Sequence, residues 1–381
     1  MRSSRPTKAE WPDRPRGGAD LRGDDRRSNQ AAAAIDSVAG EWDDLANRLD
    51  APPFLRPGWI AAWWRAFGSG DLRVHTFRRD GRLAGLVPLS RRAGTVRSPT
   101  NWHTPWFGLL SEPSAAPSLV GSVLIGSGRM RRATISFVDP CEVAAWRSCD
   151  GHGFRVLTRT LTRVACVEID GEWTRYERGL SRNTRSTLKR AMRRLQDAGE
   201  VSFEHVEGGR DLDTLLEEGF RIEALGWKGA RGSAIRSRPQ TERFYRDVAA
   251  WAAANRWLVT SFLRLNGRPI AFELAIKAGG ICYALKSGFD PTFAACSPGK
   301  LLIHSSIRRA HELGLDRYEM AGVEPYKLAW TNRLRDLAAI RVFAPSPSGL
   351  VDWAACRYME PRARKLVTAA RRPRAHPAAR G

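Results

Sequence analysis

The sequence predicts an α/β protein built from two related modules. The chain has 381 residues, of which 43% are hydrophobic and fourteen are Trp, so it is long enough to bury more than one core. The segments Arg78–Ala84 and Arg264–Ile270 share one layout, in which strand-like residues flank an Asp-Gly or Asn-Gly pair. Such a pair is a strong hairpin signal, and its recurrence along the chain implies a repeated module.

Composition divides the chain into four parts. Residues 1–33 alternate Arg, Asp, Pro and Gly before an Ala run, and we expect a disordered leader there. The first module is expected over 34–170 and the second over 171–345. The APSPSG stretch at 344–349 predicts a linker, so 346–381 are expected to hold that linker, a short helix and a basic tail.

Hydrophobic periodicity places the elements of each module. In the first module, Trp59, Trp63, Trp64 and Phe67 predict the core face of a helix, and a hairpin follows over 72–91. The second module is expected to open with a basic helix over 180–198 and to end with a strand near 336–343. Between them we expect helices near 211–226, 240–255 and 298–313, strands near 258–266, 269–277, 281–288 and 316–321, and a short helix after the last of these strands.

The cysteine pattern and the absence of long apolar runs exclude several classes of protein. The six Cys form no C-x-x-C pair and have no accompanying His cluster, so neither a metal site nor a disulfide framework is predicted. No run approaches eighteen apolar residues, and the N-terminus lacks an apolar signal region. We therefore expect a cytoplasmic protein with reduced thiols.

The net charge of +22 is concentrated in two stretches. Residues 175–194 and 357–381 each carry eight basic residues and one acid, so together they supply 14 of the net 22. Such concentration predicts an acidic partner at a particular face, and nucleic acid, anionic lipid and a phosphorylated substrate all remain open. For the basic tail, we expect peripheral contact with an anionic membrane.

The segment FDPTFAACSPGKLL at 289–302 predicts an anion site where a strand leads into a helix. Ser297 is a favoured N-cap and Pro298 suits the first helical position. Backbone N–H groups of Gly299, Lys300 and Leu301, the helix dipole and the Lys300 ammonium would then converge on a pyrophosphate. A well-capped structural helix is the alternative.

Four blocks resemble one family in the same order. They are PFLRPGW at 53–59, WKGARGSAI at 227–235, the 289–302 segment, and EPYK at 324–327 followed by Trp330. Together they are similar to the GNAT acetyltransferases of the cellulose-biosynthesis type, over roughly residues 50–345. The resemblance implies tandem GNAT-like modules, each a mixed central sheet flanked by helices, related in plan to Fem-type aminoacyl transferases.

The resemblance also implies an acyl thioester donor, acetyl-coenzyme A or another acyl-coenzyme A, lying along the fourth strand of the second module. Ser297, Gly299, Lys300 and Leu301 would bind its pyrophosphate. The double-glycine loop usual in the superfamily is replaced here by Cys-Ser-Pro-Gly-Lys, which offers fewer glycines beside the phosphates.

Acyl transfer needs a base for the acceptor, donors to the oxyanion and an acid for the leaving thiolate. The resemblance assigns the acid to Tyr326, while Glu324 is the candidate base and Lys327 would bind an anion or stabilise developing charge. Helix capping and packing are the structural alternatives for all three. Glu273 and Asp290 are less favoured carboxylates, since the first is compatible with a strand surface and the second with a turn before Pro291.

The acceptor is expected near the loop 227–235, where GNAT folds bind it. Trp227, Lys228, Asp290 and Arg185 are the predicted substrate-binding residues. Three functions remain open: an acyl-coenzyme A dependent N- or O-transferase acting on an envelope or polysaccharide precursor, a Fem-type transferase using aminoacyl-tRNA, and a polyanion-binding protein without catalysis. The histidines show no metal spacing, and no metal is predicted.

Overall fold

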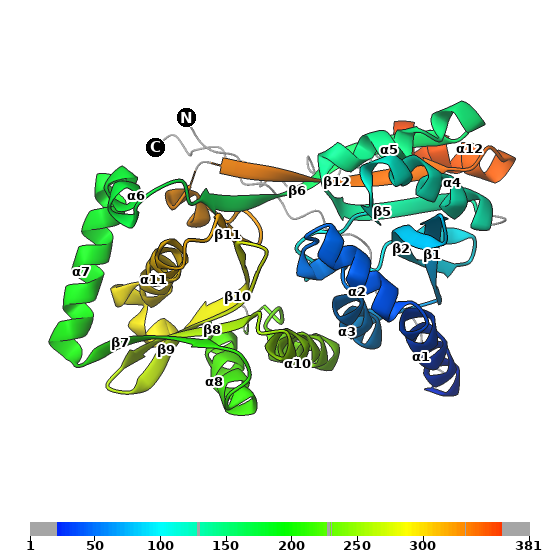
Figure 1. The fold of residues 1–381 in the computed structure, drawn as a ribbon. Coiled ribbons are helices and arrows are strands. Elements are labelled where there is room, and N and C mark those ends of the chain that lie inside the picture. The colour runs from blue at the N-terminus through cyan, green and yellow to red at the C-terminus, as the bar shows by residue number, and fades with distance from the viewer. Residues whose placement is uncertain (1–20, 128–129, 227–228, 230, 332, 360–381) are drawn as a thin grey trace, which may run out of the picture.

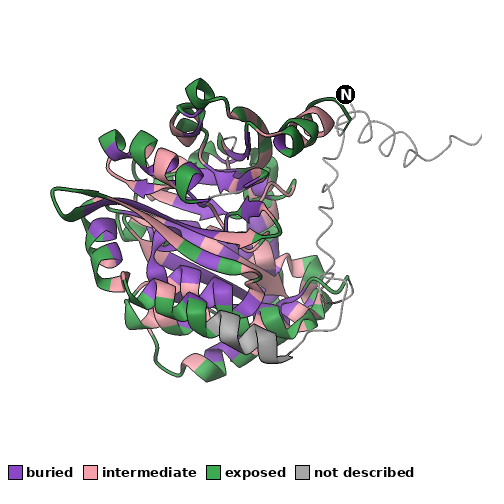
Figure 2. Ribbon diagram, turned by 90° about the vertical axis from the view of Figure 1, so that its right-hand side faces the viewer, coloured by how far each residue is buried: buried purple, intermediate pink, exposed green. Residues whose placement is uncertain are grey.

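The computed structural model describes residues 21–127, 130–226, 229, 231–331 and 333–359. Within them, twelve strands form one mixed sheet with helices on both of its faces (Figure 1). The predicted α/β class is therefore confirmed. Figure 2 shows that buried residues are concentrated in the sheet and on the helix surfaces facing it.

The first half of the chain supplies the elements on one side of the molecule in Figure 1. They are α1 (Leu21–Asp36), α2 (Ala39–Arg48), α3 (Pro57–Phe67), β1 (Asp71–Arg79), β2 (Arg82–Arg92), β3 (Thr95–Arg97), β4 (Leu110–Ser111), α4 (Ala116–Gly126), β5 (Arg132–Val138), α5 (Val143–Arg147) and β6 (Arg155–Glu168).

The second half follows the predicted order closely. It comprises α6 (Trp173–Gly179), α7 (Arg182–Ala198), β7 (Val201–Glu207), α8 (Leu212–Leu225), α10 (Pro239–Ala254), β8 (Leu258–Leu265), β9 (Arg268–Ala278), β10 (Ile281–Phe289), α11 (Pro298–Glu312), β11 (Arg317–Met320), β12 (Arg333–Phe343) and α12 (Pro347–Ala354). Single helical turns η6 (Pro291–Cys296) and η7 (Lys327–Ala329) precede α11 and follow β11.

The two hairpins that indicated a repeat are alike in detail. Asp80-Gly81 and Asn266-Gly267 all have positive φ, as a tight two-residue turn requires. Each hairpin also carries a bulge beside the arginine before the turn. The side chains of Arg78 and Arg264 donate to the carbonyl of the turn glycine, at 3.2 and 3.3 Å.

The modules exchange their last strands. The sheet order is β1-β2-β3-β5-β12-β6-β11-β10-β9-β8-β7, so β12 from the second half pairs with β5 and β6 from the first half pairs with β11. The strands β6 and β12 also pair with each other, from Arg333 opposite Cys166 to Phe343 opposite Arg155. The expected boundaries at 170 and 345 remain a division of the sequence. In the folded sheet, β6 pairs with a strand of the second half and β12 pairs with a strand of the first half.

A shared core reinforces this exchange. Phe54, before α3, packs edge to face on Tyr283 of β10, with ring centroids 4.8 Å apart. Trp59 of α3 packs in the same way on Phe244 of α10, at 5.3 Å. Because these four aromatic residues are buried and come from both halves, the modules share one hydrophobic cluster.

Two expectations at the ends of the folded region need correction. Residues 21–33 belong to the helix α1 rather than to a disordered leader, since the Ala run favours a helix and Ala31 and Ile35 are buried. The expected linker is also shorter than predicted, because Ser346 accepts a hydrogen bond from the Gly349 amide and α12 begins at Pro347. Residues 1–20 and the tail 360–381 lie outside the described residues.

The shared core predicts that the two modules unfold together. Phe54→Ala should lower the free energy of unfolding by about 3–5 kcal/mol, because it removes a fully buried ring at the contact between modules. Urea unfolding followed by tryptophan fluorescence and by circular dichroism measures this, with Phe54→Leu as the milder control. Two separate transitions, of which only one shifts, would contradict a shared core.

Candidate functional site

Strands β10 and β11 separate in the middle of the sheet. They pair in parallel only over Ile281–Ala284 and Arg317–Met320. Beyond that point β10 bulges at Leu285 and continues along β9 to Phe289. In the described part of the chain, no strand pairs with the β11-facing edge of 285–289. An open strand edge of this kind offers backbone N–H and C=O groups to an extended ligand.

Tyr326 lies across this opening from β10. Its hydroxyl is hydrogen-bonded to Ser287, which lies beyond the bulge, and its side chain is 41% exposed. Desolvation and the nearby carboxylates of Glu324 and Glu273 raise the pKa of the Tyr326 phenol, outweighing the opposing effect of Ser287. The phenol is therefore protonated at neutral pH and has a proton to donate.

Lys327 stabilises the loop that carries Tyr326. Its ammonium lies 2.7 Å from Glu324 Oε2 and also donates to the carbonyl of Ala321. Its side chain is buried, whereas the Glu324 side chain is 41% exposed. Lys327 thus binds its own loop, and Glu324 is the member of this pair that solvent and substrates can reach.

Glu273 is a core residue and not the strand-surface residue considered from sequence. It is 2% exposed on β9, opposite Ser287 of β10, and accepts a hydrogen bond of 2.6 Å from Tyr318 of β11. Burial raises the pKa of Glu273 and outweighs the opposing effect of the Tyr318 hydrogen bond. The pair therefore joins β9 to β11 across the intervening strand β10, close to the opening.

Asp290 anchors the turn between β10 and α11. Its carboxylate accepts from the Thr292 amide at 3.0 Å, from the Thr292 hydroxyl at 2.6 Å and from Arg268 at 2.7 Å. Burial favours the protonated acid, but these hydrogen bonds and the Arg268 charge outweigh it and lower the pKa of Asp290. The Asp290 carboxylate is therefore engaged within the turn, and its substrate-binding role stays a prediction.

The start of α11 differs from the predicted cap. Ser297 occupies the N-cap position in a left-handed conformation, with φ of 46°, and its side chain makes no capping hydrogen bond. Its carbonyl instead accepts from the amides of Lys300 and Leu301, at 3.0 and 3.3 Å. The predicted convergence of three free amides is thus reduced, and Gly299 contributes the amide nearest the turn. A side chain at Gly299 would begin 3.2 Å from the Phe289 ring.

The predicted substrate residues lie at separate places. Arg185 is exposed on α7, where it lines a groove together with Leu301 of α11. Trp227 and Lys228 lie outside the described residues. The end of their loop is fixed by the Ile235 amide, which donates to the buried Glu223 of α8 at 2.8 Å.

Sequence reasoning missed a polar cluster on the opposite face of the sheet. Tyr245 of α10 is buried and its hydroxyl lies 3.1 Å from His103 Nδ1 of the first module. The Lys286 ammonium, beyond the β10 bulge, lies 5.4 Å from the centre of the Tyr245 ring. Glu223 packs against Gly288 of the same segment. No spacing pattern links these residues, because four separate elements bring them together.

The described residues of the first module form no equivalent opening. Its β3 and β5 pair in parallel, as β10 and β11 do, but Phe107 forms a bridge with Val138 directly after them. Phe107 is fully buried, and the carboxylate of Glu142 accepts from the Leu109 amide at 2.8 Å. The segment that carries Phe107 therefore occupies, in the first module, the place that corresponds to the opening between β10 and β11.

Across the residues that the structure describes, no three His, Cys, Asp or Glu side chains come together as a metal site requires. No helix in the same residues is both long and apolar enough to cross a bilayer.

Comparison with known proteins gives one family match, in the second half of the chain, and several structural neighbours. Residues 182–328 match the family model described as "Acetyltransferase (GNAT) domain". No curated protein matches the chain. Among solved structures, FemX superposes with a TM-score of 0.55 at 12% identity, over 78% of this chain and 93% of FemX.

Two further structures show the same fold. The C-terminal domain of an inferred lysylphosphatidylglycerol synthetase from Agrobacterium fabrum has a TM-score of 0.53 at 14% identity, over 84% of this chain and 96% of that domain. A conserved protein of unknown function from Bacteroides thetaiotaomicron has a TM-score of 0.50 at 10% identity, over 75% and 90% of the two chains. At these identities the structural likeness concerns the fold alone.

Asp290 gives a pH-dependent prediction. A carboxyl whose pKa is lower in the folded protein stabilises it above the unfolded pKa of about 4, and this stabilisation is lost as pH falls through the folded value. Asp290→Asn should therefore lower the free energy of unfolding by about 1–3 kcal/mol at pH 7, with a smaller difference from the parent below about pH 3. Urea titrations across pH measure this, with the exposed Asp197→Asn as control. A loss that is constant across pH would contradict the assignment.

Proposed function

We propose that this protein is an acyltransferase that moves an acyl group, acetyl in the simplest case, from acyl-coenzyme A to an amine or hydroxyl. The observation that carries the proposal is the opening between β10 and β11. Tyr326 lies beside this opening, and α11 is the helix that follows β10 along the chain. An extended thioester arm would pair with the free edge of 285–289, and its diphosphate would lie at the helix start.

The residues around the opening suit the steps of acyl transfer. Attack of the acceptor nitrogen or oxygen on the thioester carbonyl places negative charge on the carbonyl oxygen, which the β10 backbone N–H groups would stabilise. Glu324 would remove the acceptor proton, directly or through a water molecule. Collapse of the tetrahedral intermediate breaks the C–S bond, and Tyr326 would give its proton to the departing thiolate. Lys327 would act indirectly, by positioning Glu324.

The acceptor would approach from the face that carries Tyr245, His103 and Lys286. His103 and Lys286 are half-buried and offer an imidazole ring and a cation beside the bulged part of β10, while the buried Tyr245 positions His103 through its hydroxyl. Such groups suit a hydroxyl-rich or anionic acceptor, which agrees with a precursor of an envelope or exopolysaccharide. We place the reaction in the cytoplasm, with peripheral membrane contact through the basic tail 357–381.

A second candidate is a Fem-type transferase that takes its donor from aminoacyl-tRNA. The exposed cations of α7 favour it, because a row of basic side chains suits a phosphate backbone. Calorimetric titration separates the two candidates. Binding of acetyl-coenzyme A to the folded protein supports the first, whereas tRNA binding that bulk DNA does not displace, without any coenzyme A binding, supports the second.

Gly299→Asp tests the donor site. A carboxylate at the start of α11 would repel the diphosphate, so coenzyme A affinity should fall about tenfold or more, while the acidic side chain complements the helix dipole and leaves folding intact. Gly299→Ala is the matched control, since it introduces the same contact with Phe289 without the charge. Equal affinities for both variants and the parent would show that the donor binds elsewhere.

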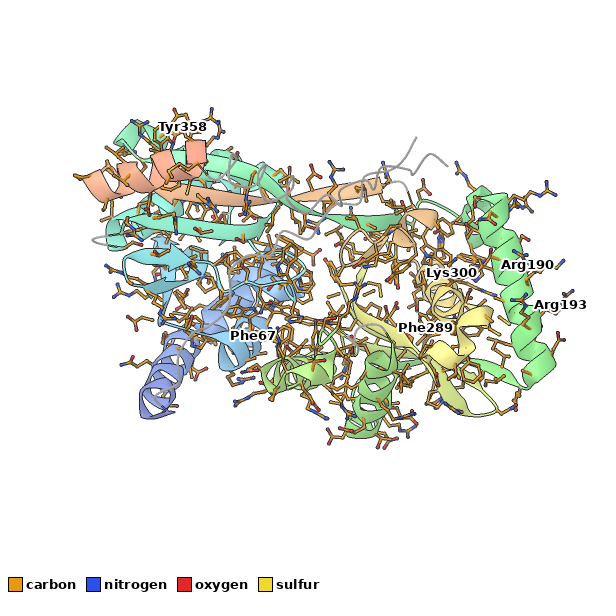
Figure 3. The ribbon with its side chains drawn as sticks, turned by 180° about the vertical axis from the view of Figure 1, so that it is seen from behind. Phe67, Arg190, Arg193, Phe289, Lys300 and Tyr358 are labelled. Atoms are coloured by element: carbon orange, nitrogen blue, oxygen red, sulfur yellow. The ribbon has the colours of Figure 1, made fainter. Side chains whose placement is uncertain are left out.

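Tyr326→Phe tests the chemistry. Removal of the hydroxyl alone should lower kcat by about 10²–10⁴ with little change in donor binding, because the proton it donates matters only in the transition state. Tyr358→Phe is the control, since Tyr358 is exposed near the C-terminal end of the described chain, far from the opening (Figure 3). Turnover within about threefold of the parent would remove Tyr326 as the acid.

Glu324→Gln tests the base. The amide keeps the size of the side chain but accepts no proton, so kcat should fall at neutral pH and KM should change little. The loop would keep its shape if Lys327 still binds the Ala321 carbonyl, which thermal unfolding can check. An unchanged kcat would leave Glu324 with a structural role.

A further inference from the structure

A groove of about 300 Å³ lies between α6, α7 and α11 on the same side of the sheet as the start of α11. Leu188 and Met192 of α7 and Leu301 of α11 form its apolar floor. Three cations, Arg178, Arg185 and Lys189, surround that floor. Glu177 and His304, which lie 2.9 Å apart, complete the lining.

The basic residues of the helices α6 and α7 between 175 and 194 have no acidic partners in the described chain. All eight basic residues of 175–194 are exposed, and none forms an ion pair with an acidic side chain that the structure describes. Other arginines are paired on both sides, as Arg264 is with Glu204 and Glu218. A row of cations without acidic partners in the described residues repels itself, so it suits an anionic ligand.

The position of the groove relates it to the donor. Leu301 belongs both to the first turn of α11 and to the groove floor, so the groove begins within one helical turn of the proposed diphosphate site. Figure 3 shows Lys300 of α11 facing the helix that carries Arg190 and Arg193. A ligand whose diphosphate lies at the start of α11 would therefore place its next groups in the groove.

The lining suits a nucleotide. An apolar floor with a polarisable Met supports the face of a base, and arginine stacks on bases and binds phosphate with two parallel hydrogen bonds. The volume is that of a site for a small ligand portion rather than for a folded partner. The single carboxylate in the lining, Glu177, is already engaged with His304.

We propose that the α6–α7–α11 groove binds the phosphorylated nucleotide end of the acyl donor, with the base on the apolar floor and the ribose phosphate between Arg185 and Lys189. This inference rests on the proposed function, because it assumes that the diphosphate lies at α11. On this proposal, α6 and α7 distinguish donors that carry the ribose phosphate from donors that lack it, although neither helix borders the opening between β10 and β11. Donors lacking the ribose phosphate would bind without this contribution.

The test is a calorimetric comparison of coenzyme A with 3′-dephospho-coenzyme A, using the full chain. The parent should bind coenzyme A about tenfold more tightly or better, because phosphate bonds to arginine and lysine are charge-assisted. The double variant Arg185→Gln, Lys189→Gln should lose that preference and keep its affinity for the dephosphorylated ligand. The matched control Arg190→Gln, Arg193→Gln removes two cations of the same helix that do not line the groove and should keep the preference.

Three outcomes would overturn the inference: the parent binds both ligands equally, the groove variant keeps the preference, or the control loses the preference as fully as the groove variant does. If the groove variant keeps the preference but loses affinity for a short single-stranded RNA, the groove binds nucleic acid instead. In each of these cases acyl-coenzyme A still binds and the proposed function stands. Failure of the parent to bind either ligand would instead contradict the proposed function itself.

Discussion

The exchange of β6 and β12 is the constraint on which the rest of the structure depends. Because β12 leaves the second module to pair with β5, the place beside β11 is taken by β6 from the first half. The two strands then pair with each other along their length, so neither module completes its sheet alone. The backbone hydrogen bonds of the exchanged strands hold the modules in one orientation, and the aromatic contacts of Phe54 and Trp59 fill the space between them.

The same framework keeps one opening and closes the other. In the second module β11 pairs with β6 along the edge that faces away from β10. After the bulge at Leu285, β10 follows β9 and separates from β11. The buried Tyr318–Glu273 hydrogen bond joins β11 to β9 across β10, close to this divergence. In the first module Phe107 occupies the corresponding place. Two modules of common plan thus differ at the position where the proposed donor would bind, so the proposed catalysis belongs to the second module alone.

Local signals in the sequence predicted most elements, and the reasons are physical. Gly after Asp80 or Asn266 specifies a tight turn, and Pro298 and the apolar stripe of α11 specify a helix, whatever the rest of the chain does. The strand exchange and the contact of His103 with Tyr245 depend on residues more than a hundred positions apart, and no local pattern encodes them. The bulge at Leu285 lies between neighbouring strands, but the sequence carries no Gly or Pro there to mark it. Within the candidate site, Tyr326 lies beside the opening with Glu324 close to it, and their catalytic roles stay predictions. The contacts of Asp290 and Ser297 were not predicted. Asp290 accepts from Arg268 and the Thr292 amide, and Ser297 accepts from α11 through its carbonyl and not through its side chain.

Amide hydrogen exchange with and without acetyl-coenzyme A tests the central claim most directly, because it reports where the donor binds. If the donor lies along the open edge of β10 and at the start of α11, exchange should slow in peptides covering 285–289 and 297–301. Peptides covering 95–116 of the first module should exchange at the same rate with and without the donor, because Phe107 fills the equivalent place. Slowing confined to the first module, or no slowing at 285–301 when the donor is saturating, would contradict the account.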